Sequence, residues 1–129
     1  MATSEDFVQT CLRQQGDRYV FATETSPLDP DPTQFDCSEL VQWTAGRVSI
    51  TLGVPDGAYY QWKYSTAITM AHGLSTRGAL LFVGDGVGVG RDAITHVAVS
   101  LGDSTTIEAR GRKWASDAGP RSTGSTSPD

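Results

Sequence analysis

The sequence has little basic charge, no long apolar run and few cysteines. Its 129 residues include 10 Lys and Arg against 15 Asp and Glu, which gives a formal net charge of −5. The basic footprint of a nucleic-acid-binding protein and the polybasic stretch that binds anionic lipid are therefore both missing. No apolar run is long enough to span a bilayer. We expect neither nucleic acid nor a membrane as a partner.

The N-terminus and the C-terminus differ from the middle of the chain. Residues 1–6 are acidic and lack an apolar core, so we expect no secretory signal and synthesis in the cytoplasm. Residues 115–129 are rich in Ser, Thr, Gly and Pro without apolar periodicity, which predicts a flexible tail or linker. The length suits one core, so we expect a single domain over residues 1–114.

The two cysteines are too few for a disulfide framework, and their surroundings differ. Cys11 shares one face of a predicted helix, residues 4–15, with other apolar side chains, which predicts a core position. We expect Ser4 to cap this helix. Cys37 instead stands where a proline-containing loop turns into a helix over 37–47, with Asp36 as N-cap. Because the N-terminal end of a helix is positive, it stabilises a thiolate over a thiol, and a thiolate there needs only a base to act as a nucleophile.

A base is predicted in the strand over residues 95–101, which alternates and contains His96 on its small, polar face. If residues 102–104 form a three-residue hairpin loop, Glu108 on the return strand lies on the same face as His96, one diagonal step away. A two-residue loop would put Glu108 on the other face. In the first case Glu108 orients the imidazole toward a nucleophile. The alternative is that Glu108 is a surface carboxylate partnered by Arg110 or Arg112.

The segments between these motifs have weaker signals. Residues 58–72 predict two short helices with four aromatic side chains. We expect most of these in the core or partly in the core, the alternative being a groove for an extended substrate. Residues 78–83 predict a buried strand and residues 84–92 a glycine-rich loop. This loop lacks the spacing of a dinucleotide-binding motif.

Over residues 5–112 the chain resembles the NlpC/P60 family of papain-like cysteine peptidases, which cut the peptide stems of bacterial cell walls. The motifs that carry the resemblance are Gly-Asp-Arg-Tyr-Val-Phe at 16–21, Phe-Asp-Cys-Ser at 35–38, Gly-Ala-Leu-Leu-Phe at 78–82, Thr-His-Val-Ala-Val-Ser-Leu-Gly at 95–102, and Thr-Ile-Glu-Ala at 106–109. The resemblance implies an α+β papain-like fold, in which the nucleophile helix packs on an antiparallel sheet. It implies no metal and no cofactor.

The family also implies roles for individual residues. Cys37 corresponds to the nucleophile and His96 to the base, while Glu108 stands where the family has a variable third polar residue. Tyr19 matches a tyrosine beside the nucleophile that assists the oxyanion or the substrate. Asp36 and Ser38 match residues that shape the pocket for the free amine of a peptide stem. The implied reaction is hydrolysis of a peptidoglycan stem peptide, with the D-γ-glutamyl–diamino-acid bond as the candidate bond.

Several positions depart from the family pattern and concern pocket shape rather than the reacting groups. Ala22 and Thr23 replace a Gly-Gly pair, Glu39 replaces a glycine and Ala79 replaces a frequent aspartate. The Glu39 form resembles phage-encoded members. We therefore expect a lysin that reaches the wall after holin release, or part of a virion tail, fused to or assembled with a wall-binding or tail module. Two alternatives stay open: a non-catalytic wall-binding or structural module, and an amidase or acyltransferase on the same fold.

Overall fold

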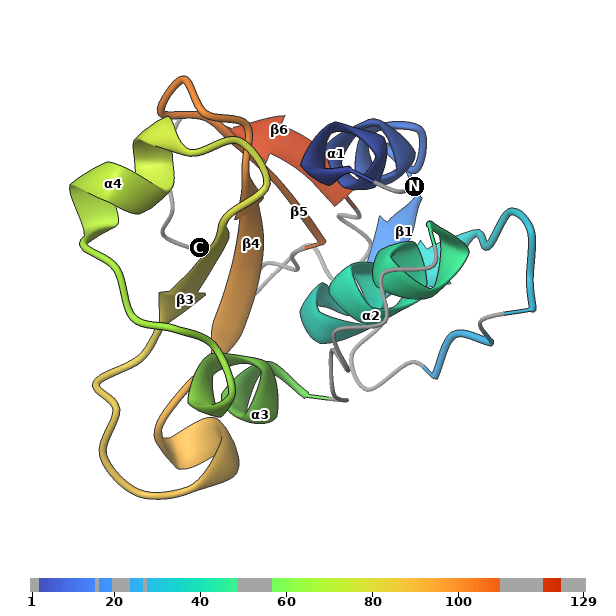
Figure 1. Ribbon diagram of the computed structural model, residues 1–129. Helices are drawn as coiled ribbons and strands as arrows, with labels where there is room; N and C mark the ends of the chain where they lie inside the picture. Colours follow the sequence, from blue (N-terminus) through green and yellow to red (C-terminus); the bar gives the residue numbers. More distant parts are fainter. Residues whose placement is uncertain are drawn as a thin grey trace.

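The computed structural model describes residues 3–15, 17–19, 24–26, 28–48, 57–109 and 120–123. The elements follow in the order α1 (Ser4–Leu12), β1 (Arg18–Tyr19), β2 (Gln34–Phe35), α2 (Cys37–Arg47), α3 (Ala58–Lys63), α4 (Met70–Ser75), β3 (Leu80–Val83), the 3-10 helix η1 (Gly90–Asp92), β4 (His96–Ser100), β5 (Thr106–Ala109) and β6 (Pro120–Thr123). Figure 1 shows helices grouped around a curved sheet, so the fold is of the predicted α+β class. None of the described helices is both long enough and apolar enough to cross a membrane.

The main sheet is antiparallel, with strand order β3-β4-β5-β6. Val99 pairs with Ile107, and the backbone N–H of Leu101 donates to the carbonyl of Thr105 at 2.9 Å. The connection is therefore the three-residue loop 102–104, the first of the two alternatives that the sequence left open. Gly102 in this loop has a φ of +86°, a left-handed conformation that glycine adopts without strain. The register that the loop imposes keeps Glu108 on the face of His96.

The helix α2 begins and ends where the sequence predicts. Asp36 is its N-cap, and Oδ1 of its carboxylate accepts from the backbone N–H of Glu39 at 2.8 Å. Leu40 and Val41 are buried at 1% exposure each, so this stripe of α2 faces the core. The cap and the stripe together fix both the start of the helix and the face that it buries.

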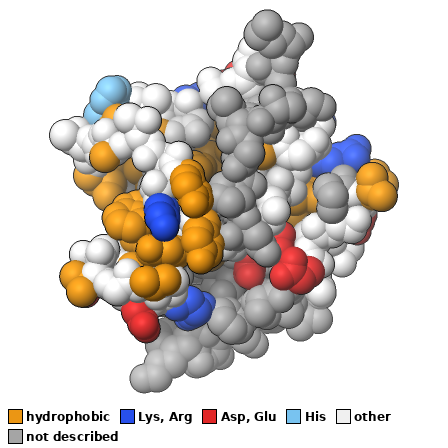
Figure 2. Space-filling model, turned by 60° about the horizontal axis from the view of Figure 1, so that its bottom comes forward, with side chains coloured by type: hydrophobic (Ala, Val, Ile, Leu, Met, Phe, Trp, Pro, Cys, Tyr) orange, Lys and Arg blue, Asp and Glu red, His pale blue; other side chains and the backbone are white. Residues whose placement is uncertain are grey.

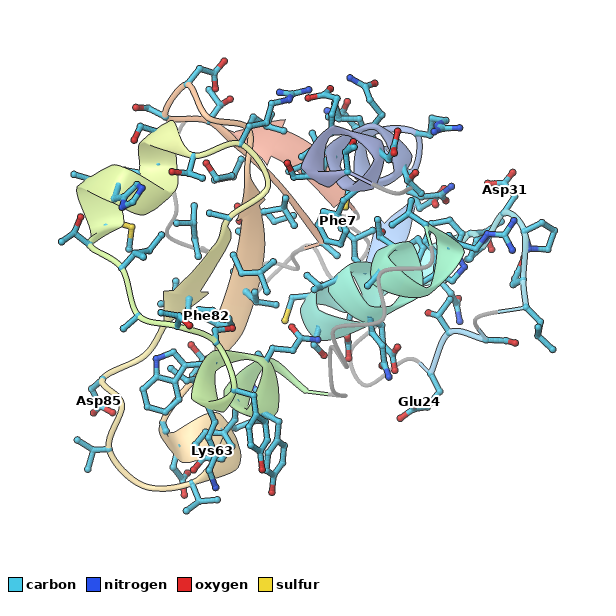
Figure 3. The ribbon with its side chains drawn as sticks, viewed as in Figure 1. Phe7, Glu24, Asp31, Lys63, Phe82 and Asp85 are labelled. Atoms are coloured by element: carbon cyan, nitrogen blue, oxygen red, sulfur yellow. The ribbon has the colours of Figure 1, made fainter. Side chains whose placement is uncertain are left out.

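The core lies between α1, α2 and one face of the main sheet. It contains Phe7, Val8, Cys11, Phe35, Leu40, Val41, Trp43, Ala45, Val97, Val99, Ile107 and Ala109. Phe7 points from α1 into the space toward α2 (Figure 3). The Ser100 hydroxyl, which alternates with Val97 and Val99 along β4, donates to the Leu74 carbonyl of α4 at 3.3 Å. Helix α4 therefore covers the opposite face of the sheet.

The cap of α1 differs from the prediction. Thr3, not Ser4, is the N-cap: its hydroxyl accepts from the Asp6 N–H, and the Asp6 carboxylate accepts from the Thr3 N–H. This reciprocal pair is a capping box, which satisfies two backbone donors at once and so outcompetes a single cap. The helix ends at Leu12, earlier than the predicted residue 15.

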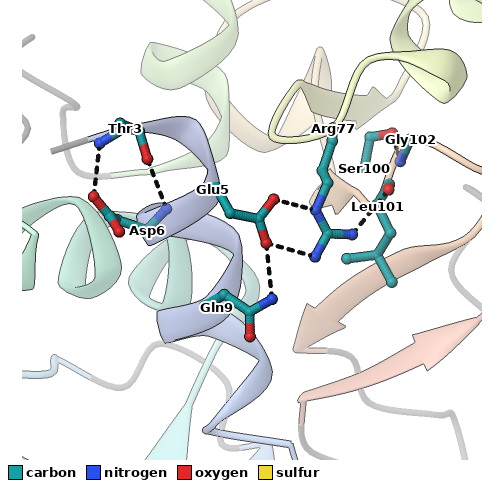
Figure 4. A network of polar contacts seen from close by, with 8 residues as sticks. All are labelled: Thr3, Glu5, Asp6, Gln9, Arg77, Ser100, Leu101 and Gly102. Atoms are coloured by element: carbon teal, nitrogen blue, oxygen red, sulfur yellow. Dashed lines mark hydrogen bonds and ion pairs between the residues drawn. The ribbon is translucent and has the colours of Figure 1, made fainter.

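A polar network fastens α1 to the sheet (Figure 4). The guanidinium of Arg77 donates to Glu5 from Nε at 2.6 Å and from Nη2 at 3.0 Å, and its Nη1 donates to the Leu101 carbonyl at 3.1 Å. The hydrogen bonds from Arg77, and a further one from Gln9, lower the pKa of Glu5 to about 2. One side chain thus joins the first helix to the hairpin that follows β4.

The strand β6 lies inside the segment for which the sequence predicts a flexible tail. Its backbone pairs antiparallel with β5, for example Ile107 with Ser122 and Glu108 with Arg121. Residues 120–123 are therefore part of the sheet, and the tail prediction is wrong for them. The sequence of this strand shows no apolar alternation, because a strand at the edge of a sheet is held by backbone hydrogen bonds to its neighbour. Residues 110–119 and 124–129 lie outside the described residues.

Candidate active site

The first residue of α2, Cys37, meets the first residue of β4, His96. The Cys37 sulfur lies close enough to the ring to raise the His96 pKa, and His96 is 5% exposed whereas Cys37 is partly exposed. The structure therefore brings together the predicted nucleophile and the predicted base, 59 positions apart in the chain. Cys37 is only partly buried, which leaves room for a substrate to reach it.

Glu108 stands on the other side of the His96 ring. Its Oε1 lies 3.3 Å from Nε2 of His96, and the carboxylate is 1% exposed. Because Nε2 faces the carboxylate, Nδ1 is the nitrogen left for Cys37. The arrangement has the order of a catalytic triad: sulfur, imidazole and carboxylate.

Thr106 holds the carboxylate in this orientation. Its hydroxyl donates to Oε2 of Glu108 at 2.6 Å inside the buried sheet face. We did not single out Thr106 from the sequence, although the signal was there: residues two apart on a strand share a face. The hydroxyl leaves Oε1 directed at the His96 ring, so Thr106 fixes the orientation of the carboxylate that contacts this ring.

The His96 pKa reflects these neighbours. Burial by itself lowers it, but the hydrogen bonds with Cys37 and Glu108 and the coulombic attraction to both outweigh burial and raise the pKa to about 9. The imidazolium form therefore persists through neutral pH. An imidazolium beside a sulfur is the partner that a thiolate requires.

The remaining predicted site residues surround the start of α2. The Ser38 hydroxyl donates to Oδ1 of Asp36 at 3.2 Å, and Ser38 is 6% exposed. Both side chains thus support the first turn of α2 next to Cys37. The backbone of Tyr19 in β1 pairs in parallel with Phe35 of β2, which places its chain just before the nucleophile. The side chain of Tyr19, like residues 20–23, lies outside the described residues.

Beside this site, α3 and the following loops carry an exposed apolar surface. Tyr60, Trp62 and Tyr64 are 44%, 38% and 71% exposed, so the expectation that most of these aromatics lie in the core or partly in it is wrong for these three. Figure 2 shows apolar side chains gathered around a basic one on this face, and in Figure 3 Lys63 extends from α3 away from the sheet. An apolar groove of about 560 Å³ runs between α3, α4 and β3, lined by Trp62 and Phe82 among others.

The rings remain exposed because α3 turns a different residue inward. Gln61 is 2% exposed, and its Nε2 donates to the carbonyl of Ser38 at 3.1 Å. The sequence carried no signal for this contact, since a glutamine flanked by aromatics is not a recognised core pattern. Among the described residues, no group of three or more His, Cys, Asp or Glu side chains is arranged to hold a metal ion.

Comparisons with known proteins agree on one family. The family model described as NlpC/P60 family matches residues 16–121. Among curated proteins, none matches the chain in sequence.

Solved structures of NlpC and P60 proteins share the fold of this chain. NlpC1 from Trichomonas vaginalis has a TM-score of 0.67 at 18% identity, covering 95% of this chain and 39% of that one. The NlpC/p60 domain of the peptidoglycan hydrolase SagA has a TM-score of 0.67 at 23% identity, covering 94% and 88%. The P60 domain of an antigen from M. avium subspecies paratuberculosis has a TM-score of 0.66 at 22% identity, covering 97% and 90%. The chain spans about two fifths of the length of the two Trichomonas vaginalis proteins.

Proposed function

Because the chain belongs to the NlpC/P60 family, we propose that it is a cysteine peptidase that hydrolyses the peptide stems of peptidoglycan. The observation that carries the proposal is the contact of Cys37 with His96, backed by Glu108. The description of one structural neighbour as a peptidoglycan hydrolase supports the choice of substrate.

The reaction follows from the three side chains. The Cys37 thiolate attacks the carbonyl carbon of the scissile amide, and the negative charge moves to the carbonyl oxygen. The backbone N–H of Cys37 at the start of α2, with Tyr19, stabilises this oxyanion. His96 gives its Nδ1 proton to the leaving amine, the C–N bond breaks and a thioester remains.

Water completes the cycle. His96, now neutral, takes a proton from the water as the water oxygen attacks the thioester carbonyl. The C–S bond breaks, the stem peptide leaves with a new carboxylate, and the thiolate–imidazolium pair is restored. Throughout, Glu108 keeps the ring in one orientation and compensates its positive charge. Asp36 and Ser38 line the position where the free amine of the stem would bind.

We place the cleaved bond between D-γ-glutamate and the diamino acid, and the enzyme in a phage lysin or virion tail. Glu39, in place of the family's usual glycine, supports the phage origin. Detection of the chain in purified virions would support the tail role, and detection only in late lysates the lysin role. Absence from both would overturn the phage assignment.

The experiment compares the wild-type chain with Cys37→Ala on defined muropeptides and weighs the products. We expect Cys37→Ala to lose more than about a thousandfold in kcat, as for other covalent nucleophiles. Cys11→Ala is the matched control, since Cys11 is buried in the core away from His96, and it should keep activity. Wall hydrolysis that survives in Cys37→Ala would refute the mechanism. Product masses that show acyl transfer to an amine would instead identify an acyltransferase.

A further inference from the structure

Helix α3 sends one polar side chain into the interior, directly against the start of the nucleophile helix. Gln61 is 2% exposed although its neighbours Tyr60 and Trp62 are partly exposed. Figure 1 shows α3 next to the end of α2 that lies nearest β4. Burying an amide is costly unless it forms hydrogen bonds, so packing alone does not account for glutamine at this position.

The Gln61 side chain bonds to the peptide group between Ser38 and Glu39, and the N–H of this same peptide group bonds to a second side chain. Nε2 of Gln61 donates to the Ser38 carbonyl at 3.1 Å, while the N–H of Glu39 donates to Oδ1 of Asp36 at 2.8 Å. This carbonyl and this N–H belong to one planar peptide unit. Its orientation is therefore fixed from both sides, one residue beyond Cys37.

We propose that Gln61 is a positioning residue for the nucleophile. By holding the Ser38 carbonyl, it sets the first turn of α2 and with it the Cys37 sulfur against the His96 ring. This inference deepens the proposed function and rests on Cys37 being the nucleophile. It gives α3 a part in the reaction that goes beyond its exposed aromatic surface.

The physical effect acts through geometry and polarisation. A misplacement of about 1 Å at a reacting group can cost about a hundredfold in rate. A donor on the Ser38 carbonyl also polarises the same peptide unit, which strengthens the bond from the Glu39 N–H to Asp36. Loss of the Gln61 amide therefore loosens the turn that carries both the Cys37 sulfur and its backbone N–H.

The test replaces the Gln61 amide and keeps the volume of the side chain. Gln61→Met keeps the length of the side chain but cannot donate to Ser38. Gln14→Met is the matched control: Gln14 is also buried, at 5% exposure, and its Nε2 bonds to Asp31 at 3.2 Å, within another part of the fold. Each variant loses one buried amide, and its melting temperature measures what that loss costs in stability.

Two readouts separate positioning from stability. The first is the rate of alkylation of Cys37 by iodoacetamide as a function of pH, which needs no peptidoglycan. The second is kcat and KM on a defined muropeptide. For Gln61→Met we expect alkylation below pH 7 to slow by about tenfold or more and kcat to fall with little change in KM. Gln14→Met should keep the wild-type alkylation profile and kcat.

A second variant covers the case in which Gln61→Met does not fold. Gln61→Glu has the same shape, and its protonated carboxyl can still donate to Ser38 whereas its carboxylate cannot. Alkylation of Gln61→Glu should therefore match wild type at low pH and fall below it as the carboxyl ionises.

The proposal is overturned if both Gln61 variants keep the wild-type alkylation profile, or if their kcat falls no more than that of Gln14→Met. This outcome is distinct from failure of the proposed function. Wall hydrolysis surviving in Cys37→Ala would refute the peptidase mechanism, whereas the alkylation profile reports on the sulfur with any substrate or none.

Discussion

Replacing Glu108 by glutamine removes the charge behind the His96 ring while it keeps the side-chain volume. Oε1 of Glu108 lies 3.3 Å from Nε2 of His96, and Oε2 accepts from the Thr106 hydroxyl at 2.6 Å. The amide oxygen of glutamine can still accept from Nε2. The coulombic attraction to the imidazolium is lost, so the substitution separates charge from hydrogen bonding.

The size of the effect follows from the His96 pKa. Burial lowers this pKa, and interactions with Cys37 and Glu108 overcome burial and raise it from 6.5 to about 9. That difference corresponds to about 3 kcal/mol in favour of the imidazolium. A single opposite charge at this range moves a pKa by about 1–3 pH units, and the hydrogen bond with Cys37 is the larger contribution. We therefore expect Glu108→Gln to lower the His96 pKa by about one pH unit.

The assay is the pH dependence of kcat/KM on a muropeptide, together with NMR titration of the His96 ring. The descending limb of kcat/KM reports loss of the imidazolium in the free enzyme, so it should move about one pH unit toward neutrality in Glu108→Gln. Glu24→Gln, at an exposed carboxylate, is the control and should leave the limb in place. A Glu108→Gln limb and ring titration that coincide with wild type would refute the role of the Glu108 charge.

Three further predictions concern the cysteines, the cap and stability. In the native protein one thiol, Cys37, should react with iodoacetamide, since Cys11 is fully buried and burial raises its pKa to about 12. Both thiols should react in denaturant. Rapid labelling of Cys11 in the native protein would contradict its burial. Asp36→Ala should lower the free energy of unfolding by about 1 kcal/mol through loss of the α2 cap, measured by urea denaturation, and an unchanged midpoint would argue against the cap. Because the folded-state pKa of His96 is raised, its protonation stabilises the fold in full below about pH 6.5, and this contribution is lost as pH rises through about 9. The melting temperature should therefore fall across that window, and His96→Gln should abolish this part of the fall.

The hairpin of β4 and β5 is a feature that local sequence patterns could predict. A loop of three residues after Leu101 was enough to predict that Glu108 faces His96, and the register confirms it. The bounds of α2 followed equally from a cap and an apolar stripe. These predictions hold because hairpin register and helix start depend on side chains within a few residues of each other.

The predictions that failed concern the exposed aromatic side chains of α3 and the edge strand of the sheet. Tyr60, Trp62 and Tyr64 are exposed although aromatic residues favour burial, because Gln61 occupies the inward position of α3. The strand at 120–123 carries no apolar alternation and is held by backbone pairing with β5. Burial of a short helix and pairing of an edge strand both depend on distant segments, which local patterns do not report.

By itself, the sequence determined the helix that begins at Cys37 and, given a three-residue loop, the hairpin that aligns His96 with Glu108, while the α+β class followed from the family resemblance. Short-range backbone geometry encodes these features, since caps, loop length and strand alternation act over a few residues. Only the tertiary structure decided that the Cys37 sulfur lies beside the imidazole, that Thr106 holds the carboxylate, and that Gln61 bonds to the turn after Cys37. Those contacts form when packing of the core brings separate elements together. The burial of apolar area that drives this packing involves the whole fold, so no short segment encodes it.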